Sequence, residues 1–438
     1  MGMALPLIGA QLLQMCNGLV DAIVAGRLGS IELAAGGIGA GIWFFASLLC
    51  IGLMAGLSPA LSELIGQGRR AAVGKAFRQG LWLGLFTGLF ALALALFFVT
   101  TLGQWALQPE LVPFIKKYLL GACWSLPAFA IVMACRNVCE ATAVVKPVLL
   151  VQAVGLAVNV VADLGFGLGW FGLPRYGLFG IGLATSSVMI TMAVTLLLIL
   201  RRDIFKRYQL FSGLERPDWL HLKPMLVLAV PIYFALLFEA GLFVATAIQM
   251  GMIGTLEAGG HYIAISIAGA CYMLPLGLSF ALTARVGRVY GRQSFPAIRL
   301  RIVSGLVITF MMAIVTASLL LIFRHQITSL YVNDVQVQAV AAHLLIFAAL
   351  FQLPDAAQCA LLGLLRGLQD TRVPMLINLF AYWGVAFSVG YYCAHHLGWG
   401  ASGLWGGLIL GLTVSSLLLS MRLWIRMKQL DKAGVAIA

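Results

Sequence analysis

Four carboxylic acids interrupt long apolar stretches of this sequence, and they are its strongest candidates for chemistry. They are Asp21, Asp163, Glu239 and Asp355. An ionisable side chain inside a bilayer costs about 3 kcal/mol or more, so such a residue is a functional candidate by default. Acids placed in this way can bind a cation or carry a proton. The structural alternative is that protonated or paired carboxyl groups hold helices together.

Two of these acids fall in the first half of the chain, together with other oxygen-bearing side chains. Asn159 and Asp163 are four residues apart, on one face of a helix. Asp21 is late in the first apolar stretch, and Thr185 is early in an oppositely directed one, so all four lie at a similar depth. Hard oxygen ligands suit a small cation such as Na⁺, and two adjacent carboxylates can instead share a proton. We therefore predict a site for Na⁺ or H⁺.

The second pair of acids predicts another cation site in the second half of the chain. Glu239, Tyr272 and Asp355 all fall near the middle of apolar stretches. Tyr272 can offer a cation its hydroxyl or its ring face. Phe243, four residues after Glu239, either lines the same pocket or packs as an ordinary apolar residue. Asp334 precedes another apolar stretch, where it either attracts cations or caps a helix.

The composition excludes a soluble protein of this size. The 438 residues are 62% hydrophobic and only 10% charged, whereas soluble domains carry about 25% charged residues. In lipid the backbone must satisfy its own hydrogen bonds, as helices or as a closed barrel. Stretches such as 81–99 and 306–323 lack the alternation of barrel strands. The fold class is therefore an all-α polytopic membrane protein.

Twelve spanning helices account for most of the chain and explain its net charge of +13. If the N-terminus is cytoplasmic, 23 basic residues fall on the inner side and 5 on the outer side. This asymmetry fits the positive-inside rule and predicts that both termini are in the cytoplasm. The net positive charge therefore does not need nucleic-acid binding as its explanation. The expected helices cover about 5–26, 33–58, 77–101, 114–142, 147–167, 177–200, 225–250, 258–284, 297–323, 336–365, 373–394 and 401–425.

An internal repeat divides the chain into two halves. The decapeptide from Leu5 resembles the one from Val230, and Gly56–Gly66 resembles Gly277–Gly287, offsets of 225 and 221 residues. Two six-helix lobes that enter the membrane from the same side are related by a pseudo-two-fold axis along the membrane normal, and a transporter binds its substrate between such lobes. We expect an N-terminal lobe at 1–200, a cytoplasmic linker at 201–223 and a C-terminal lobe at 224–438.

The acids break the symmetry of this repeat, because three of them align with neutral residues in the other lobe. The alternative explanation of the duplication is a static scaffold, which has no need for such a difference. Two distinct acidic sites, in contrast, can couple the transport of two cargoes. The aligned pairs are Glu239 with Gln14, Asp21 with Thr246 and Asp355 with Ala128.

The chain resembles the multidrug and toxic compound extrusion (MATE) family, in its bacterial NorM-type branch, over essentially its whole length. Four motifs carry the resemblance: Gly18–Gly29, Gly56–Arg70, Leu237–Phe243 and Phe351–Pro374. The resemblance implies two six-helix bundles around a V-shaped central cleft. It also implies export of cationic or amphiphilic drugs and dyes in exchange for Na⁺ or H⁺ across the bacterial inner membrane.

The same resemblance assigns roles to individual residues. Family drug-contact acids match Asp21, Asp334 and Asp355, and Phe243 joins them as a candidate for drug contact. The chain departs from the family in lacking the arm that usually precedes the first helix. Family cation-site residues match Glu239, Asp355 and Tyr272 in one lobe, and Asp21, Asn159, Asp163 and Thr185 in the other.

Other functions fit the sequence less well. A lipid-linked precursor flippase of the same superfamily should have a cationic cleft for pyrophosphate, whereas the buried charges here are acidic. A membrane enzyme needs a constellation such as His-Glu-x-x-His, which the sequence lacks. A channel does not require two unequal ion sites. We expect a monomeric transporter, in contact with membrane lipid, that uses no cofactor and no metal other than Na⁺.

Overall fold

The regular structure is helical throughout the described residues. The structure, a computed structural model, describes residues 2–105, 108–213, 215–332 and 334–435. Eleven helices in these ranges are long and apolar enough to cross a membrane. Twelve spans are counted when α5 (Val112–Ala122) and α6 (Ser125–Thr142), which are bent by 45° relative to one another, are taken together as one span. The predicted all-helical polytopic class is confirmed.

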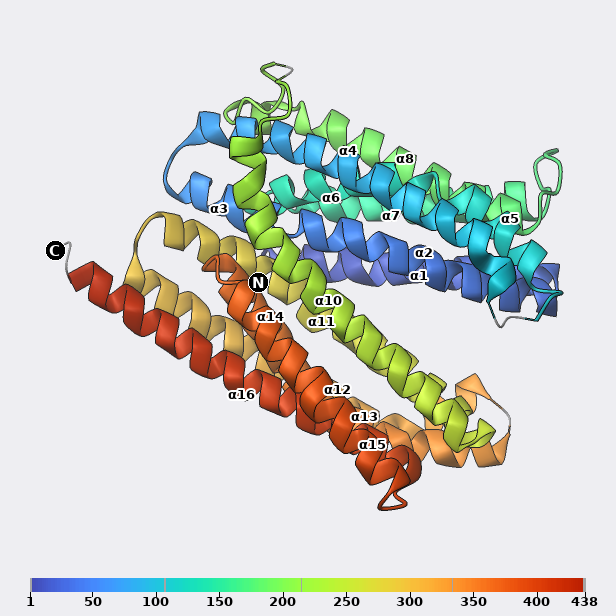
Figure 1. Cartoon of the computed structure of the whole chain (residues 1–438). Coiled ribbons are helices and arrows are strands. Elements are labelled where there is room, and N and C mark those ends of the chain that lie inside the picture. The colour runs from blue at the N-terminus through green and yellow to red at the C-terminus, as the bar shows by residue number, and fades with distance from the viewer. Residues whose placement is uncertain (1, 106–107, 214, 333, 436–438) are drawn as a thin grey trace. The chain divides into compact units, whose positions relative to one another are not determined.

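The chain divides into two compact units, Met1–Tyr233 and Phe234–Ala438 (Figure 1). The helix α10 (Trp219–Ile253) begins in the first unit and ends in the second. The remaining helices of the first unit are α1 (Ala4–Leu28), α2 (Ser30–Met54), α3 (Leu57–Gly66), α4 (Arg70–Thr101), η1 (Leu102–Gln104), α7 (Lys146–Ala162), η2 (Asp163–Gly167), α8 (Leu178–Leu200) and α9 (Asp203–Lys206). The second unit continues with α11 (Thr255–Gly291), α12 (Phe295–Tyr331), α13 (Val335–Gly367), α14 (Arg372–Leu379), η3 (Phe380–Phe387), α15 (Ser388–His395) and α16 (Gly400–Val435).

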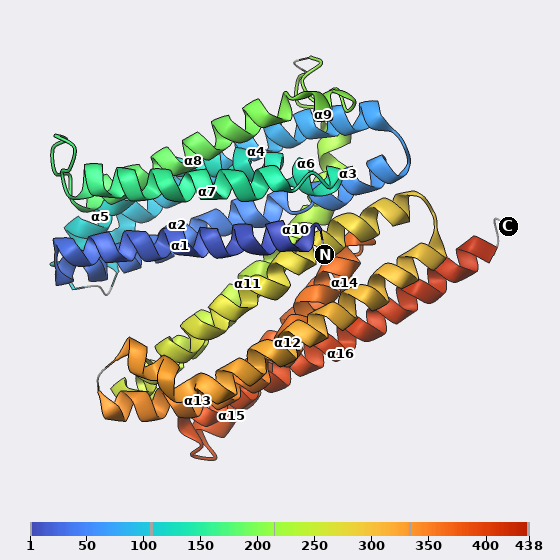
Figure 2. The ribbon, with the colours of Figure 1, turned by 180° about the vertical axis from the view of Figure 1, so that it is seen from behind.

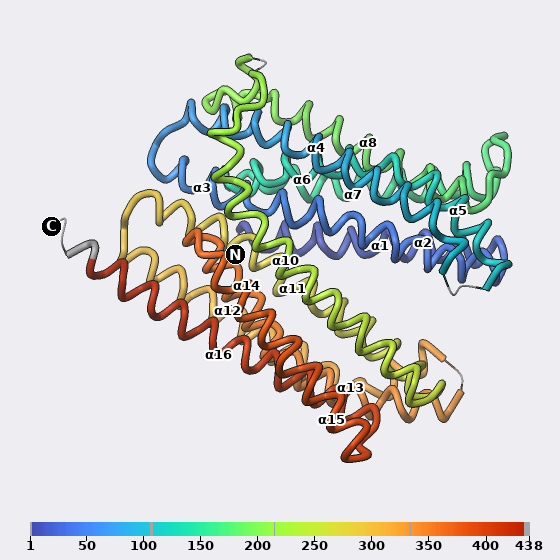
Figure 3. Tube along the Cα trace, viewed as in Figure 1, coloured from blue at the N-terminus to red at the C-terminus, as the bar shows by residue number. Residues whose placement is uncertain are grey.

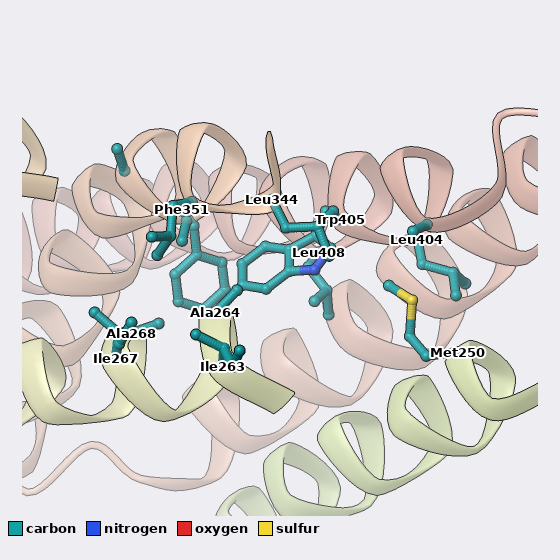
Figure 4. Packing of buried hydrophobic residues seen from close by; sticks show 14 of the residues in the cluster. Met250, Ile263, Ala264, Ile267, Ala268, Leu344, Phe351, Leu404, Trp405 and Leu408 are labelled. Atoms are coloured by element: carbon teal, nitrogen blue, oxygen red, sulfur yellow. The ribbon is translucent and has the colours of Figure 1, made fainter. Parts of the chain in front are cut away.

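The helix α13 is the centre of the second unit, where it packs against α11, α12 and α16 (Figure 2). Phe351 of α13 meets Trp405 of α16 nearly edge to face, with ring centroids 5.8 Å apart. Ile263 and Ile267 of α11 belong to the same buried cluster (Figure 4). Because this apolar packing fixes the rotation of α13 about its axis, it also fixes the direction of Asp355, one turn after Phe351.

Several helices extend further than their apolar segments. The helix α11 covers 255–291 where the hydropathy pattern predicts 258–284, and α12 covers 295–331 instead of 297–323. Hydropathy marks where the apolar side chains end, but the backbone hydrogen bonds of a helix continue into its polar ends. The predicted number and order of spans are unaffected.

The polar segment between the lobes is held against α4, and we call it the strap (residues 201–213 and 215–218). Arg78 of α4 donates from Nη1 to the carbonyl oxygen of Gln209 at 2.7 Å, and its Nη2 forms an ion pair with Glu215. Trp82 donates from Nε1 to the carbonyl oxygen of Glu215 at 2.8 Å. These side chains satisfy strap carbonyl groups that have no partner in a helix or a strand.

Apolar side chains of the strap add to this attachment. Phe205, Tyr208 and Leu210 are buried, and Phe211 meets Phe77 of α4 edge to face at 5.9 Å. The boundary between the compact units therefore differs from the predicted linker at 201–223 and falls at Tyr233 and Phe234. There the chain continues through α10 without a break (Figure 3). The composition of the strap predicts a polar segment, but it does not show that the few apolar residues of the strap attach it to the first unit.

Gly74 of α4 provides a test of the strap. A Cβ atom at Gly74 would lie 2.4 Å from the carbonyl oxygens of both Tyr208 and Gln209. We expect Gly74→Ala to destabilise the protein by about 1–3 kcal/mol, because the strap backbone must move away. The measurement is the thermal unfolding midpoint of the purified protein in detergent.

The matched control is Gly41→Ala in α2, where a Cβ atom would meet nothing within 4 Å. Alanine favours a helix interior more than glycine does, so this variant should keep or raise the midpoint. Equal midpoints for the Gly74 and Gly41 variants would show that the strap is loosely attached.

Candidate cation-binding sites

The first candidate site collects four predicted residues from four helical segments of the first unit. Asp21 lies on α1, Asn159 on α7, Asp163 at the first position of η2 and Thr185 on α8. The helix α7 packs against both α1 and α8, so it brings their polar residues together. Asn159, Asp163 and Thr185 are buried, and Asp21 is half-buried.

Asn159 joins the two carboxylates. Its Nδ2 atom donates to Asp21 Oδ1 at 2.8 Å and, more weakly, to Asp163 Oδ2 at 3.4 Å. The carboxyl groups of Asp21 and Asp163 also lie close enough to share a hydrogen bond when one of them is protonated. One neutral amide cannot balance two negative charges, so the site requires a proton or a cation from outside the protein.

Two buried oxygen atoms of this site point to the same requirement. Asn159 Oδ1 and Asp163 Oδ1 have no hydrogen-bond partner within the described ranges. A buried acceptor without a partner costs about 1–3 kcal/mol. A small monovalent cation that binds these oxygens, or a proton on Asp163, would remove this cost.

Tyr118 belongs to the same site but was not predicted from the sequence. This tyrosine of α5 is 3% exposed, and its hydroxyl interacts with that of Thr185. It also lies within range of the charges of Asp21 and Asp163. Its spacing from these acids along the chain has no helical regularity. Only the packing of α5 against α8 brings Tyr118 to the site.

A short π-helical turn sets the position of Asp163. The segment η2 (Asp163–Gly167) widens the end of α7, and such turns are frequent at functional sites. The helix α8 crosses it closely at Gly180, where a Cβ atom would lie 2.1 Å from the carbonyl oxygen of Phe166. Glycine at position 180 therefore allows the two backbones to meet.

The second candidate site lies within the second unit. Glu239 on α10, Tyr272 on α11 and Asp355 on α13 are close enough for their charges and the tyrosine hydroxyl to interact. Asp355 is 3% exposed. Among the described residues, no side-chain or backbone hydrogen bond acts on either carboxylate. The structure thus brings the three predicted residues together around two acids that lack protein donors.

Tyr382 extends this second site and was also missed by sequence reasoning. It is fully buried on η3, accepts a hydrogen bond from Gln358 Nε2, and lies within range of both Glu239 and Asp355. The segment η3 is a π-helical stretch in the fifth span of the second unit, as η2 is in the first. A tyrosine in an apolar run gives no periodic signal that would mark it as polar lining.

Of the remaining two predicted residues, Asp334 lies at the far end of α13 from Asp355, whereas Phe243 lies one turn from Glu239 on α10. Asp334 is exposed, and it caps α13 by accepting hydrogen bonds from the backbone N–H groups of Gln336 (2.8 Å) and Val337 (3.4 Å). It precedes Asp355 by 21 residues on the same helix, a rise of about 30 Å. Phe243 packs edge to face on Phe351 at 6.3 Å. It also lines an apolar pocket of about 340 Å³ between α10 and α11.

The chemistry of these sites is that of oxygen ligands. Among the described residues, no group of three or more His, Cys, Asp or Glu side chains is arranged to hold a metal ion. Each site instead combines two carboxylates with neutral oxygen-bearing side chains. This arrangement suits an exchangeable monovalent cation or a proton.

Comparison with known proteins gives matches over the whole chain. A family model described as MatE matches residues 6–164 and again residues 231–392. The chain is 38% identical over 425 residues to "Probable multidrug resistance protein NorM" of Xanthomonas axonopodis pv. citri, covering 96% of this chain and 92% of the relative. It is 31% identical over 442 residues to "Multidrug resistance protein MdtK" of Proteus mirabilis, covering 99% and 96%.

Solved structures share the fold. A MATE crystal structure in the straight conformation aligns with a TM-score of 0.91 at 18% identity, covering 98% of this chain and 96% of that one. The Vibrio cholerae MATE transporter VcmN in the bent form aligns with a TM-score of 0.85 at 16% identity, covering 99% and 96%.

The close crossing at Gly180 can be tested directly. We expect Gly180→Ala to lower the unfolding midpoint and to displace η2, because the added methyl group would overlap the Phe166 carbonyl. The accessibility of Asp163 to a carboxyl-modifying carbodiimide, read by mass spectrometry, should increase. Gly26→Ala of α1, where the nearest atom to a Cβ would be 3.9 Å away, is the control. Unchanged labelling of Asp163 in Gly180→Ala would contradict this account of η2.

Proposed function

The chain belongs to the MatE family of multidrug transporters, and from this premise we propose that it exports cationic or amphiphilic drugs in exchange for Na⁺ or H⁺. Membership of this family and the similarity to the NorM and MdtK multidrug resistance proteins indicate multidrug efflux. This activity is transport rather than enzyme catalysis. The coupling to a cation and the exchange mechanism are our proposal.

The observation that carries the proposal is the pair of buried acceptors in the first unit. Asn159 Oδ1 and Asp163 Oδ1 lack partners among the described residues and lie beside the Asp21 carboxylate. The protein supplies oxygen ligands and negative charge but no cation to balance them. The Glu239–Asp355 pair supports the proposal independently, because neither carboxylate has a hydrogen-bond donor among the described residues.

The mechanism we propose is alternating access between an outward-open and an inward-open state. A cation that enters a carboxylate site from outside neutralises it and favours release of a cationic drug. Loss of that cation to the inside frees the carboxylates to attract the next drug molecule. Each ligand must bind the two states with different affinity, since a ligand that binds both equally shifts nothing.

The membrane potential contributes only when net charge moves. Inward movement of one charge is worth about 2.3 kcal/mol per 100 mV, roughly a fiftyfold concentration ratio for a neutral cargo. Exchange of one Na⁺ for a monovalent cationic drug is electroneutral, so the ion gradient alone would drive it. We place the protein, as a monomer, in the bacterial inner membrane with both termini in the cytoplasm, as the 23-to-5 distribution of basic residues supports.

Reconstituted vesicles test the coupling. We expect purified protein to move ethidium, a cationic dye, against its gradient when an opposing Na⁺ or H⁺ gradient is imposed. The reason is that the dye and the ion compete for the carboxylates, so movement of one is coupled to movement of the other. The two gradients are imposed separately, with a protonophore present in the Na⁺ experiment. Dye movement that follows neither gradient would refute cation exchange, and movement of lipid-linked pyrophosphates instead would favour a flippase.

Neutral variants of the acids test the two sites separately. We expect Glu239→Gln or Asp355→Asn to lower drug efflux at least tenfold without loss of protein from the membrane, because each removes a charge that attracts the cations. Asp21→Asn should have the same effect if the first site couples. Efflux is measured in cells lacking other exporters, at matched protein levels.

The control for these variants is Glu110→Gln, which neutralises an exposed acid outside the helices. Normal efflux in both Glu239→Gln and Asp355→Asn would remove the second site from the mechanism. Normal efflux in Asp21→Asn would leave the first cluster with a structural role.

A further inference from the structure

Four aromatic side chains form a continuous row along the fifth span of the second unit, and we call this row the aromatic ladder. Its members recur at every fourth position: Trp383, Phe387, Tyr391 and His395. Successive ring centroids are 5.5 Å, 6.3 Å and 4.6 Å apart, within the range of about 4.5–7 Å that is favourable for aromatic pairs. The ladder therefore runs from η3 through α15 to the end of the span.

The ladder follows α10, the helix that carries Glu239. At one end the ring of Trp383 lies against α10, because a Cβ atom at Gly241 would be 3.1 Å from Cζ2 of Trp383. At the other end, Nε2 of His395 forms a hydrogen bond of 3.0 Å with Oε1 of Gln249 on α10. These two contacts hold the ladder along about two turns of α10.

The Trp383 end of the ladder borders the second candidate site. Trp383 directly follows Tyr382, which extends this site, and Gly241 lies two residues after Glu239. The ladder thus connects the depth of the second site with the end of the span. In the orientation proposed above, that end lies at the outer surface of the membrane.

The rings of the ladder are accessible from outside the protein. Trp383 is 36% exposed and Tyr391 is 41% exposed. Aromatic residues that anchor a helix gather at the two membrane surfaces, whereas Trp383 lies in the middle of the 24-residue span Arg372–His395. The face of an aromatic ring is electrostatically negative, and it attracts a cation most strongly where both have lost water. Accessible rings at this depth are therefore suited to a cationic ligand.

We propose that the aromatic ladder binds organic cations and guides them between the outer surface and the second candidate site. The inference rests on the proposed export of cationic drugs, to which it adds a binding surface that contains no acid. A cation whose charge is spread over a ring system suits the ladder best, because it can stack on the ring faces as well as be attracted by them. Na⁺ requires oxygen ligands and binds at the carboxylates instead.

Removal of a ring should weaken the binding of organic cations selectively. We expect Trp383→Leu and Tyr391→Leu each to raise the dissociation constant of ethidium about three- to fivefold, which corresponds to the loss of one cation–π contact at an accessible site. Trp383→Phe and Tyr391→Phe keep a ring face and should stay closer to the original affinity. The dissociation constant of Na⁺, obtained from its competition with ethidium, should not change.

The experiment measures ethidium fluorescence with purified full-length protein in detergent, with Na⁺ as competitor. The matched control is Tyr392→Leu, which removes a neighbouring ring that is 55% exposed and stacks on His396 instead of on the ladder. This variant should bind ethidium as tightly as the original protein does. A second probe, the uncharged aromatic dye N-phenyl-1-naphthylamine, should bind almost equally well to the original protein and to the two leucine variants of the ladder.

The outcomes separate this inference from the function on which it rests. If Na⁺ and H⁺ do not displace ethidium but both leucine variants bind it more weakly, the proposed exchange fails and the ladder stands. If competition is present but neither variant changes the affinity for ethidium, the ladder only packs α15 against α10 and the proposal is overturned. An equal loss of affinity for the uncharged dye would also overturn it.

The variants differ in their risk to folding, because Trp383 packs against α10 whereas Tyr391 is more exposed. The thermal unfolding midpoint of each purified variant shows whether it is folded. If Trp383→Leu does not fold, Tyr391→Leu decides the test. Loss of folding in both variants would assign the ladder a structural role and overturn the proposal.

Discussion

A carboxylate that leaves water must acquire a proton, a cation or hydrogen-bond donors, and most features of this protein follow from how that requirement is met. At Asp370 the protein supplies Arg422 and Arg426. At Asp218, outside the spanning helices, hydrogen bonds from the Leu220 backbone and the His221 side chain lower the pKa of the carboxyl group. The two buried pairs receive much less from the protein. Their incomplete satisfaction is the reason why we propose them as exchangeable ligand sites rather than structural ion pairs.

The two units share a repeated helical fold but surround their buried acids with different residues. The first unit links its acids through one amide, and the second places two tyrosines within range of them. Thr246, which aligns with Asp21, donates its hydroxyl to the Leu242 carbonyl of its own helix and thus adds no open ligand. The same MatE model matches both halves, so the frame is common while the chemistry has diverged. Two unequal sites are what an exchanger of unlike cargoes requires.

In a bilayer, helices do not associate through the hydrophobic effect, because lipid is as apolar as their side chains. Close backbone packing at small residues and hydrogen bonds between polar groups hold them together instead. Gly180 lets α8 touch η2, and the aromatic contact of Phe351 with Trp405 sets the rotation of α13. The strap is held on α4 by Arg78 and by buried aromatic residues.

The sequence by itself determined the features that depend on composition and short-range spacing. Long apolar segments predicted the spans, and acids within them predicted both sites, since burial of charge is costly wherever the segment packs. The tertiary structure decided everything that depends on contacts between distant segments. Tyr118 and Tyr382 reach the acids only through helix packing, and the hydrogen bonds of Asp334 show that it caps a helix. Spacing along one helix can predict which residues share a face, but only packing determines what that face meets.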